Sequence, residues 1–186
     1  MAQTYRTFIA VEISPGIADQ AARLIGRLSR TGAKVKWVDP GNLHLTLNFL
    51  GDVEALLIPD ICKAVSAAVA DIDGFDLELA GVGAFPNVAK PRTIWLGAQK
   101  GEEEMVVLHD AIEAALADLG FRGAARRFKP HLTLGRVRQI DPELSELIAK
   151  EEDFAAGRLP VDEVAIMSSE LHREGPEYTM LGHAEL

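Results

Sequence analysis

The stretch His44-Leu45-Thr46-Leu47 recurs 87 residues later as His131-Leu132-Thr133-Leu134. A second echo, in which RTFIAV at 6–11 is followed by RTIWLG at 92–97, has an offset of 86 residues. Two echoes at nearly one offset indicate an internal duplication, and a duplication constrains the architecture of the whole chain. We therefore expect one domain, residues 1–186, with two lobes and a repeat at about 5–85 and 91–170.

Strand-like and helix-like segments alternate along both halves. The alternation of apolar and polar residues predicts strands at 6–13, 35–38, 43–50, 75–82, 92–98, 131–137, 161–169 and 177–184. Apolar residues at helical spacing predict helices from Ser14-Pro15, near 59–71, at 102–119 and from Asp141-Pro142 to about 150. In the third of these helices, Leu119 is expected on the buried face and Gly120 at the C-terminal cap.

Sequential strands of this kind usually pair antiparallel, so we expect an α+β fold rather than a doubly wound parallel sheet. The two lobes, related by a pseudo two-fold axis, would each contain a mainly antiparallel sheet backed by helices. The active-site cleft would lie between them.

The composition is that of a globular protein, because 48% of the 186 residues are hydrophobic and 25% are charged. The lone cysteine, Cys62, excludes an intrachain disulfide and a cysteine-rich zinc site. No apolar run approaches the length of a membrane span, and Arg6 and Glu12 interrupt the N-terminal apolar segment, which therefore does not resemble a secretory signal. A cytoplasmic location is the expectation.

The charge is unevenly distributed. The chain has 28 acidic and 19 basic residues, a formal net charge of −9 that argues against binding along a nucleic-acid duplex. However, 11 of the basic residues fall in two windows without any acid, 20–38 and 120–138. Such patches on an acidic body favour capture of a small anion or of a strand end, although each window alone is also typical of a solvated face.

The repeated tetrapeptide places like groups on one face. Alternate side chains of a strand point the same way, so His44 and Thr46 share a face while the leucines enter the core, and His131 and Thr133 do likewise. If a two-fold axis relates the halves, two imidazoles and two hydroxyls face one cleft. At neutral pH one imidazole can act as a base and the other as an acid, while hydroxyls bind phosphate oxygens. These groups suit displacement at phosphorus without a metal ion.

Other chemistries have less support in the residues. Two histidines are fewer than the three or four ligands of a usual zinc site, and neither has a carboxylate or cysteine at helical spacing beside it. The chain has no Gly-x-Ser-x-Gly nucleophile elbow and no phosphate-binding Gly-Lys-Ser/Thr loop. The remaining histidines, His109, His172 and His183, are expected to be solvated.

The chain resembles the 2H phosphoesterases, and within them the RNA 2′,3′-cyclic phosphodiesterases, historically called 2′-5′ RNA ligases. The resemblance runs nearly end to end, through RTFIAVEI, WVDPGNLHLTLNFLG, FPNVAKPRTIWLG, RRFKPHLTLGRV and SSELHREGPEY. It implies hydrolysis of a terminal 2′,3′-cyclic phosphate to a 2′-phosphate, with no cofactor and no metal.

The resemblance also implies roles for particular residues. His44 resembles the general acid that protonates the departing 3′ oxygen, and His131 resembles the base that activates water, a division that the ligation direction would exchange. Thr46 and Thr133 correspond to the threonines that hold the phosphate. Five residues beyond each histidine stand Phe49 and Arg136, of which Arg136 matches the family's cationic phosphate contact.

The alternation of side chains along a strand argues against a place in the cleft for Phe49 and Arg136. Strict alternation puts Phe49 and Arg136 on the leucine side, so that Phe49 suits a core role as well as a border for the terminal nucleotide. A bulge or strand end near Gly135 is needed to turn Arg136 to the cleft.

A 2′,3′-cyclic phosphate requires a ribose 2′ oxygen, so the expected substrates are single-stranded RNA 3′ ends, tRNA fragments among them, bound by a monomer. The sequence leaves open mRNA decay ends and small cyclic nucleotides. Two alternatives to hydrolysis also stay open, namely ATP-independent 2′-5′ ligation and a non-catalytic protein that binds RNA ends or nucleotides.

Overall fold

The computed structural model describes residues 3–123, 127–173 and 175–186. It contains two antiparallel sheets, which confirms the α+β expectation. The four-stranded sheet consists, in spatial order, of β3 (His44–Glu54), β1 (Thr4–Glu12), β8 (Glu163–Leu171) and β9 (Pro176–Glu185). The five-stranded sheet consists of β2 (Lys34–Trp37), β6 (His131–Gln139), β5 (Thr93–Ala98), β4 (Phe75–Phe85) and β7 (Ala155–Val161).

The two strand orders correspond element by element. The order β3-β1-β8-β9 in one sheet matches β6-β5-β4-β7 in the other, so that the strands carrying the repeated motifs occupy the same places. The five-stranded sheet continues one strand further, because β2 pairs with β6. In the described part of the chain, β3 is therefore an edge strand whereas β6 is not.

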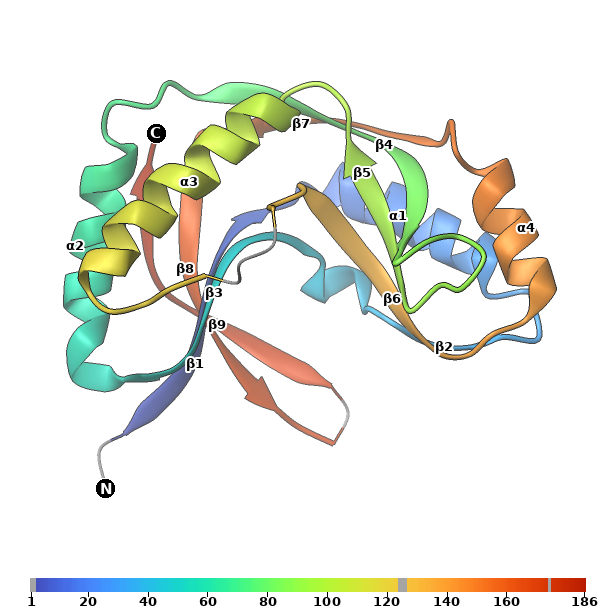
Figure 1. Cartoon of the computed structure of the whole chain (residues 1–186), viewed down its shortest axis with the longest axis horizontal. Coiled ribbons are helices and arrows are strands. Elements are labelled where there is room, and N and C mark those ends of the chain that lie inside the picture. The colour runs from blue at the N-terminus through green and yellow to red at the C-terminus, as the bar shows by residue number, and fades with distance from the viewer. Residues whose placement is uncertain (1–2, 124–126, 174) are drawn as a thin grey trace.

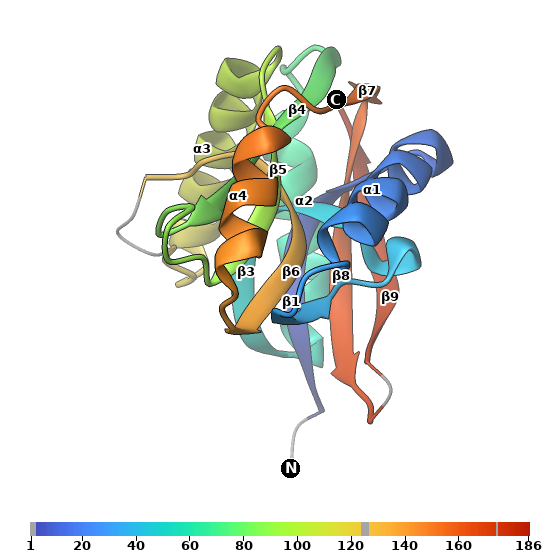
Figure 2. The same cartoon turned by 90° about the vertical axis from the view of Figure 1, so that its right-hand side faces the viewer.

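Helices pack against both sheets, as Figure 1 shows. Against the four-stranded sheet lie α2 (Ile58–Val69), which contacts β9, and α3 (Glu102–Asp118), which contacts β3. Against the five-stranded sheet lie α1 (Pro15–Leu28), which contacts β7, and α4 (Pro142–Lys150), which contacts β4. These two helices face the viewer in Figure 2. Short 3₁₀ turns at Pro40–Asn42 and Ala55–Leu57 flank β3.

The first helix shows how the sequence sets these elements. Ser14 caps it by accepting a hydrogen bond from the Ile17 N–H, and Pro15 occupies its first position. Its buried stripe, spaced by three and four residues, consists of Ile17, Ala21, Leu24 and Leu28. Burying such a stripe supplies most of a helix's stability, because propensity alone barely sustains so short a helix in water.

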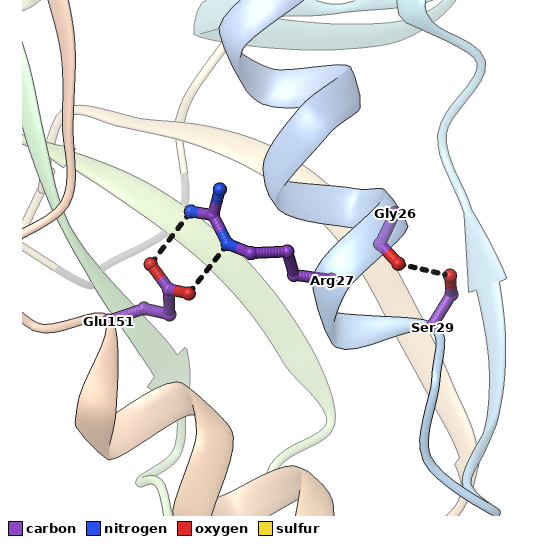
Figure 3. A network of polar contacts seen from close by, with 4 residues as sticks. All are labelled: Gly26, Arg27, Ser29 and Glu151. Carbon is purple, nitrogen blue, oxygen red and sulfur yellow. Dashed lines mark hydrogen bonds and ion pairs between the residues drawn. The ribbon is translucent and has the colours of Figure 1, made fainter.

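An ion pair joins α1 to the end of α4. The Arg27 guanidinium donates two hydrogen bonds to the Glu151 carboxylate, Nε to Oε1 at 2.7 Å and Nη2 to Oε2 at 2.8 Å (Figure 3). The guanidinium also lies 5.0 Å from the ring centroid of Phe154. Arg27, one of the basic residues of the 20–38 window, is thus engaged within the protein.

The helices and strands agree with the sequence predictions except at three places. Leu119 is 38% exposed, because α3 ends at Asp118 and Gly120 adopts a left-handed φ of 90°. In α2, helical spacing after Ile61 and Val65 predicts Ala68 on the buried face, but Val69 is the buried residue. Strand β7 was not predicted. Among the described residues no helix combines the length and the apolar character that crossing a bilayer requires.

Candidate active site

The repeated motifs begin two strands that lie in contact although they belong to different sheets, β3 and β6. His44 and Thr46 are half-buried near the start of β3, and His131 and Thr133 are half-buried near the start of β6. The leucines between and after them are buried, as strand alternation predicted.

Two adjoining cavities surround these side chains. The first, the His44 cavity, has a volume of about 680 Å³ and is lined by His44, Phe8, Tyr178, Arg6, Lys36 and Arg138 among others. The second, the His131 cavity, has a volume of about 750 Å³ and is lined by His131, Phe85, His109, Phe128, Arg122, Arg127 and Lys129 among others. Both are lined by Thr46, Thr133, Phe49 and Arg136.

The residues predicted from the sequence are therefore brought together, but the two histidines line different cavities. The four shared residues form the boundary between these cavities. Substrate spanning that boundary would meet one imidazole on each side.

Both imidazoles are held in the same way. Nδ1 of His44 lies 2.9 Å from the carbonyl oxygen of Asn42, and Nδ1 of His131 lies 2.7 Å from that of Lys129. A carbonyl oxygen only accepts hydrogen bonds, so Nδ1 carries the hydrogen in each ring. Nε2 is then the nitrogen that gains and loses a proton, and each ring keeps one orientation.

Aromatic side chains pack around His44. Its ring stacks on Phe8 with centroids 4.8 Å apart, and the edge of Tyr178 approaches at 5.1 Å. Burial lowers the pKa of His44 below its ordinary value, and the hydrogen bond to Asn42 opposes this. Burial raises the pKa of Tyr178, while the guanidinium charges of Arg136 and Arg6 oppose that rise.

The ring of His131 also lies among aromatic groups. Phe85 meets it edge-on at 5.1 Å, and Trp95 lies 6.5 Å away. The ammonium group of Lys129 lies 4.4 Å from the centroid of the Trp95 ring. Ring contacts of this kind restrict the plane of an imidazole.

Bulges decide where Phe49 and Arg136 point. Along β6, Thr133 pairs with Trp95 and Gly135 pairs with Ile94, so Leu134 is an extra residue. One extra residue reverses the alternation beyond it, which brings Arg136 to the face of His131 and Thr133. The bulge that the sequence analysis required near Gly135 is therefore present.

An equivalent bulge occurs in β3. Thr46 pairs with Ala10 and Asn48 pairs with Ile9, which leaves Leu47 as the extra residue. Phe49 is consequently 55% exposed and lines both cavities, with the Arg6 guanidinium 5.1 Å from its ring centroid. The alternative of a core role for Phe49 is wrong.

One histidine differs from the sequence prediction. His109 is not solvated, because its side chain is only 12% exposed and lines the His131 cavity. Its position in the helix signals this, since it lies four residues after Met105 and three before Ile112, both of them buried. Arg6, Phe8 and Tyr178 are further cavity residues that the sequence reasoning missed, and the alternation of residues 6 and 8 along β1 was the available signal for two of them.

The basic windows contribute to both cavities. The first window supplies Lys36, which lines the His44 cavity. Lys36 lies in β2 and pairs with Arg136 of β6. The second supplies arginines and a lysine to these cavities, although Arg126 lies outside the described residues.

One group of potential metal ligands occurs among the described residues. The ligand atoms of His109, Asp110 and Glu113 lie within 4.8 Å of one another. Asp110 is 67% exposed, and neither His44 nor His131 belongs to this group.

Comparison with known proteins identifies the class to which this fold and site belong. The sequence pattern of the 2′-5′ RNA ligase superfamily matches residues 15–173. In the solved structure of TT0787 from Thermus thermophilus, 28% of the residues are identical, the TM-score is 0.82, and the similarity covers 97% of each chain. The chain is a member of this superfamily.

Within the superfamily, the similarity is to one group of enzymes. The RNA 2′,3′-cyclic phosphodiesterase of Methanothermobacter thermautotrophicus is 35% identical over 176 residues, which are 94% of this chain and 95% of that protein. The Thermotoga maritima protein of the same name is 33% identical over 95% of this chain and 92% of its own length. The chain therefore belongs to the RNA 2′,3′-cyclic phosphodiesterase family.

Proposed function

We propose that this protein hydrolyses the 2′,3′-cyclic phosphate at an RNA 3′ end to a 2′-phosphate, with His44 and His131 as acid and base and without a metal ion. The observation that carries the proposal is the matched pair of imidazoles, each with Nδ1 on the carbonyl two residues earlier, on either side of a boundary that includes two threonines and an arginine. The names of the relatives support the same activity.

In this mechanism, Nε2 of His131 takes a proton from water while the water oxygen bonds to phosphorus. The bond from phosphorus to the 3′ oxygen breaks, and Nε2 of His44 gives its proton to that oxygen. The 2′ bond stays intact, so the product is a 2′-phosphate with a free 3′ hydroxyl. Exchange with solvent then restores the two imidazoles. General acid and base groups typically contribute about 10²–10⁴ in rate each.

The shared residues suit the phosphate between the imidazoles. Hydroxyls of Thr46 and Thr133 can donate hydrogen bonds to its non-bridging oxygens, on which negative charge develops. The planar guanidinium of Arg136 can donate two parallel hydrogen bonds to such oxygens. The exposed ring of Phe49 suits a contact with the terminal nucleotide.

The burial of His44 is compatible with the acid role. Burial lowers the pKa of His44 and so favours its neutral ring. A bound phosphate anion acts in the opposite direction, because a negative charge close by stabilises the imidazolium. Substrate binding would thus help to load His44 with the proton that it delivers.

The surroundings of the cavities suit a single strand. Lysines and arginines border both cavities while the protein as a whole carries a net charge of −9, so the attraction is local to the site. We propose single-stranded RNA 3′ ends and tRNA fragments as substrates and a monomer as the active form. Escherichia coli LigT, which is 26% identical with a TM-score of 0.73 over 99% of each chain, has been crystallised with 3′-AMP, and this supports a site for RNA-terminal nucleotides.

The test is incubation with a short RNA that ends in a 2′,3′-cyclic phosphate, followed by mapping of the oxygen that keeps the phosphate. We expect a linear 2′-phosphate, formed equally well in excess EDTA. A 3′-phosphate, or loss of activity on chelation that zinc restores, contradicts the proposal. A 2′-5′ joined product in the presence of 5′-hydroxyl RNA, as the superfamily's name suggests, would identify ligation as the reaction.

A further inference from the structure

The bulges at Leu47 in β3 and at Leu134 in β6 have carbonyl groups at equivalent positions. The two carbonyl oxygens accept hydrogen bonds from different kinds of donor. An extra residue in a bulge has no partner in the neighbouring strand of the ladder. In β6, the carbonyl oxygen of Leu134 accepts a hydrogen bond of 2.9 Å from the Val38 N–H, just beyond β2. In β3, which is an edge strand of the described sheet, the carbonyl oxygen of Leu47 accepts instead from Nδ1 of His109, at 3.0 Å.

The side chain of His109 thus provides the hydrogen-bond donor that the backbone next to β2 provides in the other sheet. His109 stands on α3, which packs against β3, and its side chain reaches the bulge from the open edge. A carbonyl oxygen only accepts, so Nδ1 of His109 is the protonated nitrogen. The two sheets are related by pseudo-symmetry, so the two carbonyl groups can be compared directly. The carbonyl oxygen of Leu134 accepts from a backbone N–H, whereas that of Leu47 accepts from a side chain.

The same imidazole contacts the other half of the site. Its ring stacks on Phe128 with centroids 4.1 Å apart and an interplanar angle of 10°. Phe128 immediately precedes Lys129, whose carbonyl oxygen holds Nδ1 of His131. Nε2 of His109 lies 3.4 Å from Glu113 and 3.9 Å from Asp110, both on its own helix. A Cβ on Gly123 would overlap the Glu113 carboxylate, so the segment after α3 packs closely on this group.

We propose that His109 is a positioning residue of the active site, which holds the β3 bulge so that Phe49 faces the same cavities as Thr46, and which positions Phe128 and Lys129 ahead of His131. The proposal rests on the proposed function for its kinetic consequence. It assigns no proton transfer to His109.

Three substitutions separate the hydrogen bond from the packing. His109→Asn keeps a donor where Nδ1 stands, because both nitrogens are bonded to Cγ. His109→Gln carries its donor one atom further out, near the position of Nε2 and Glu113. His109→Leu fills the space with no donor. A misplacement of about 1 Å costs up to ~10²-fold in rate, so we expect His109→Leu to lower kcat/KM by about 10- to 100-fold.

We expect His109→Asn to recover most of that loss and His109→Gln to recover little. The matched control is Ile112→Val, which loosens the buried face of the same helix without touching the bulge. It should lower the melting temperature and leave kcat/KM at the wild-type value. A purely structural role for His109 predicts instead that kcat/KM follows the melting temperature in all four variants, and this result would overturn the proposal.

An NMR measurement makes the outcome independent of turnover. The backbone amide shifts of Asn48 and Phe49 report the bulge in the absence of substrate, and we expect them to move in His109→Leu and to return in His109→Asn. Unmoved shifts in His109→Leu overturn the positioning role even if the wild-type enzyme is active. Moved shifts together with an inactive wild type support that role and refute the proposed hydrolysis.

Discussion

Removing either of the two imidazoles that we propose as acid and base should have a different effect on two substrates that differ in one atom. The first substrate is an RNA 2′,3′-cyclic phosphate, and in the second a sulfur atom replaces the 3′ oxygen. A 3′ oxygen needs a proton in order to depart, whereas sulfur leaves readily as a thiolate. With the oxygen substrate, His44→Ala and His131→Ala should each lower kcat by about 10²–10⁴, which corresponds to ~3–5 kcal/mol of transition-state stabilisation.

The structure places the expected loss for His44 toward the upper end of this range. Its ring is packed between Phe8 and Tyr178, at 4.8 and 5.1 Å, so solvent replaces it poorly as a proton donor. With the sulfur substrate, His44→Ala should lose little activity, because no proton donor is needed. His131→Ala should lose as much as before, since water must still be deprotonated.

Single-turnover measurements of both substrates with both variants provide the test. His183→Ala is the control, because His183 is exposed and lines neither cavity. If His44→Ala lost equal activity on both substrates and His131→Ala regained activity on the sulfur substrate, His44 would be the base and His131 the acid. Wild-type rates for both variants would refute acid–base catalysis by this pair.

Four further predictions concern charge and titration. Arg136→Ala should lower kcat/KM by about 10- to 100-fold in steady-state assays, because a hydrogen bond to a charged group contributes ~1.5–3 kcal/mol, and Arg136→Lys should recover only part of it; an unchanged value contradicts the phosphate contact. The pKa of His44, followed by NMR, should lie below 6.5 and should rise in Tyr178→Ala, which exposes the ring. Between that lowered pKa and 6.5 the unfolded chain binds more protons at His44 than the folded chain, so acidification through this window should lower the free energy of unfolding in urea titrations. At pH 7, Glu151→Gln should lower the free energy of unfolding by about 1 kcal/mol, less in high salt, since Arg27 is 40% exposed; no change in low salt would contradict a stabilising ion pair.

Most of the elements follow from local sequence. The Ser14-Pro15 cap and the spacing of Ile17, Ala21 and Leu24 predicted α1, because capping and helical periodicity act over a few residues. Strand β7 escaped prediction because Gly157 and Pro160 interrupt its pattern. This strand forms because it pairs with β4, which is distant from it in the sequence.

The candidate site was predictable in part. The positions of His44, Thr46, His131 and Thr133 follow from alternation before the bulges. Beyond the bulges, strict alternation gives the wrong face for Phe49, because an extra residue in one strand is defined only by the partner strand. His109 could not be assigned to the site, since its contact with Leu47 spans 62 residues and two different elements.

By itself, the sequence determined the repeated His-x-Thr pairs, the strands that carry them, the apolar faces that those strands bury and the family of the protein. Only the tertiary structure decided that strands of the first half, β2 and β4, complete the sheet of the second, that the imidazoles border two adjoining cavities, and that a helix holds the open edge of β3. Local propensity and alternation act between near neighbours in the chain. Strand partners, bulges and edges depend instead on which distant segments supply hydrogen bonds to one another.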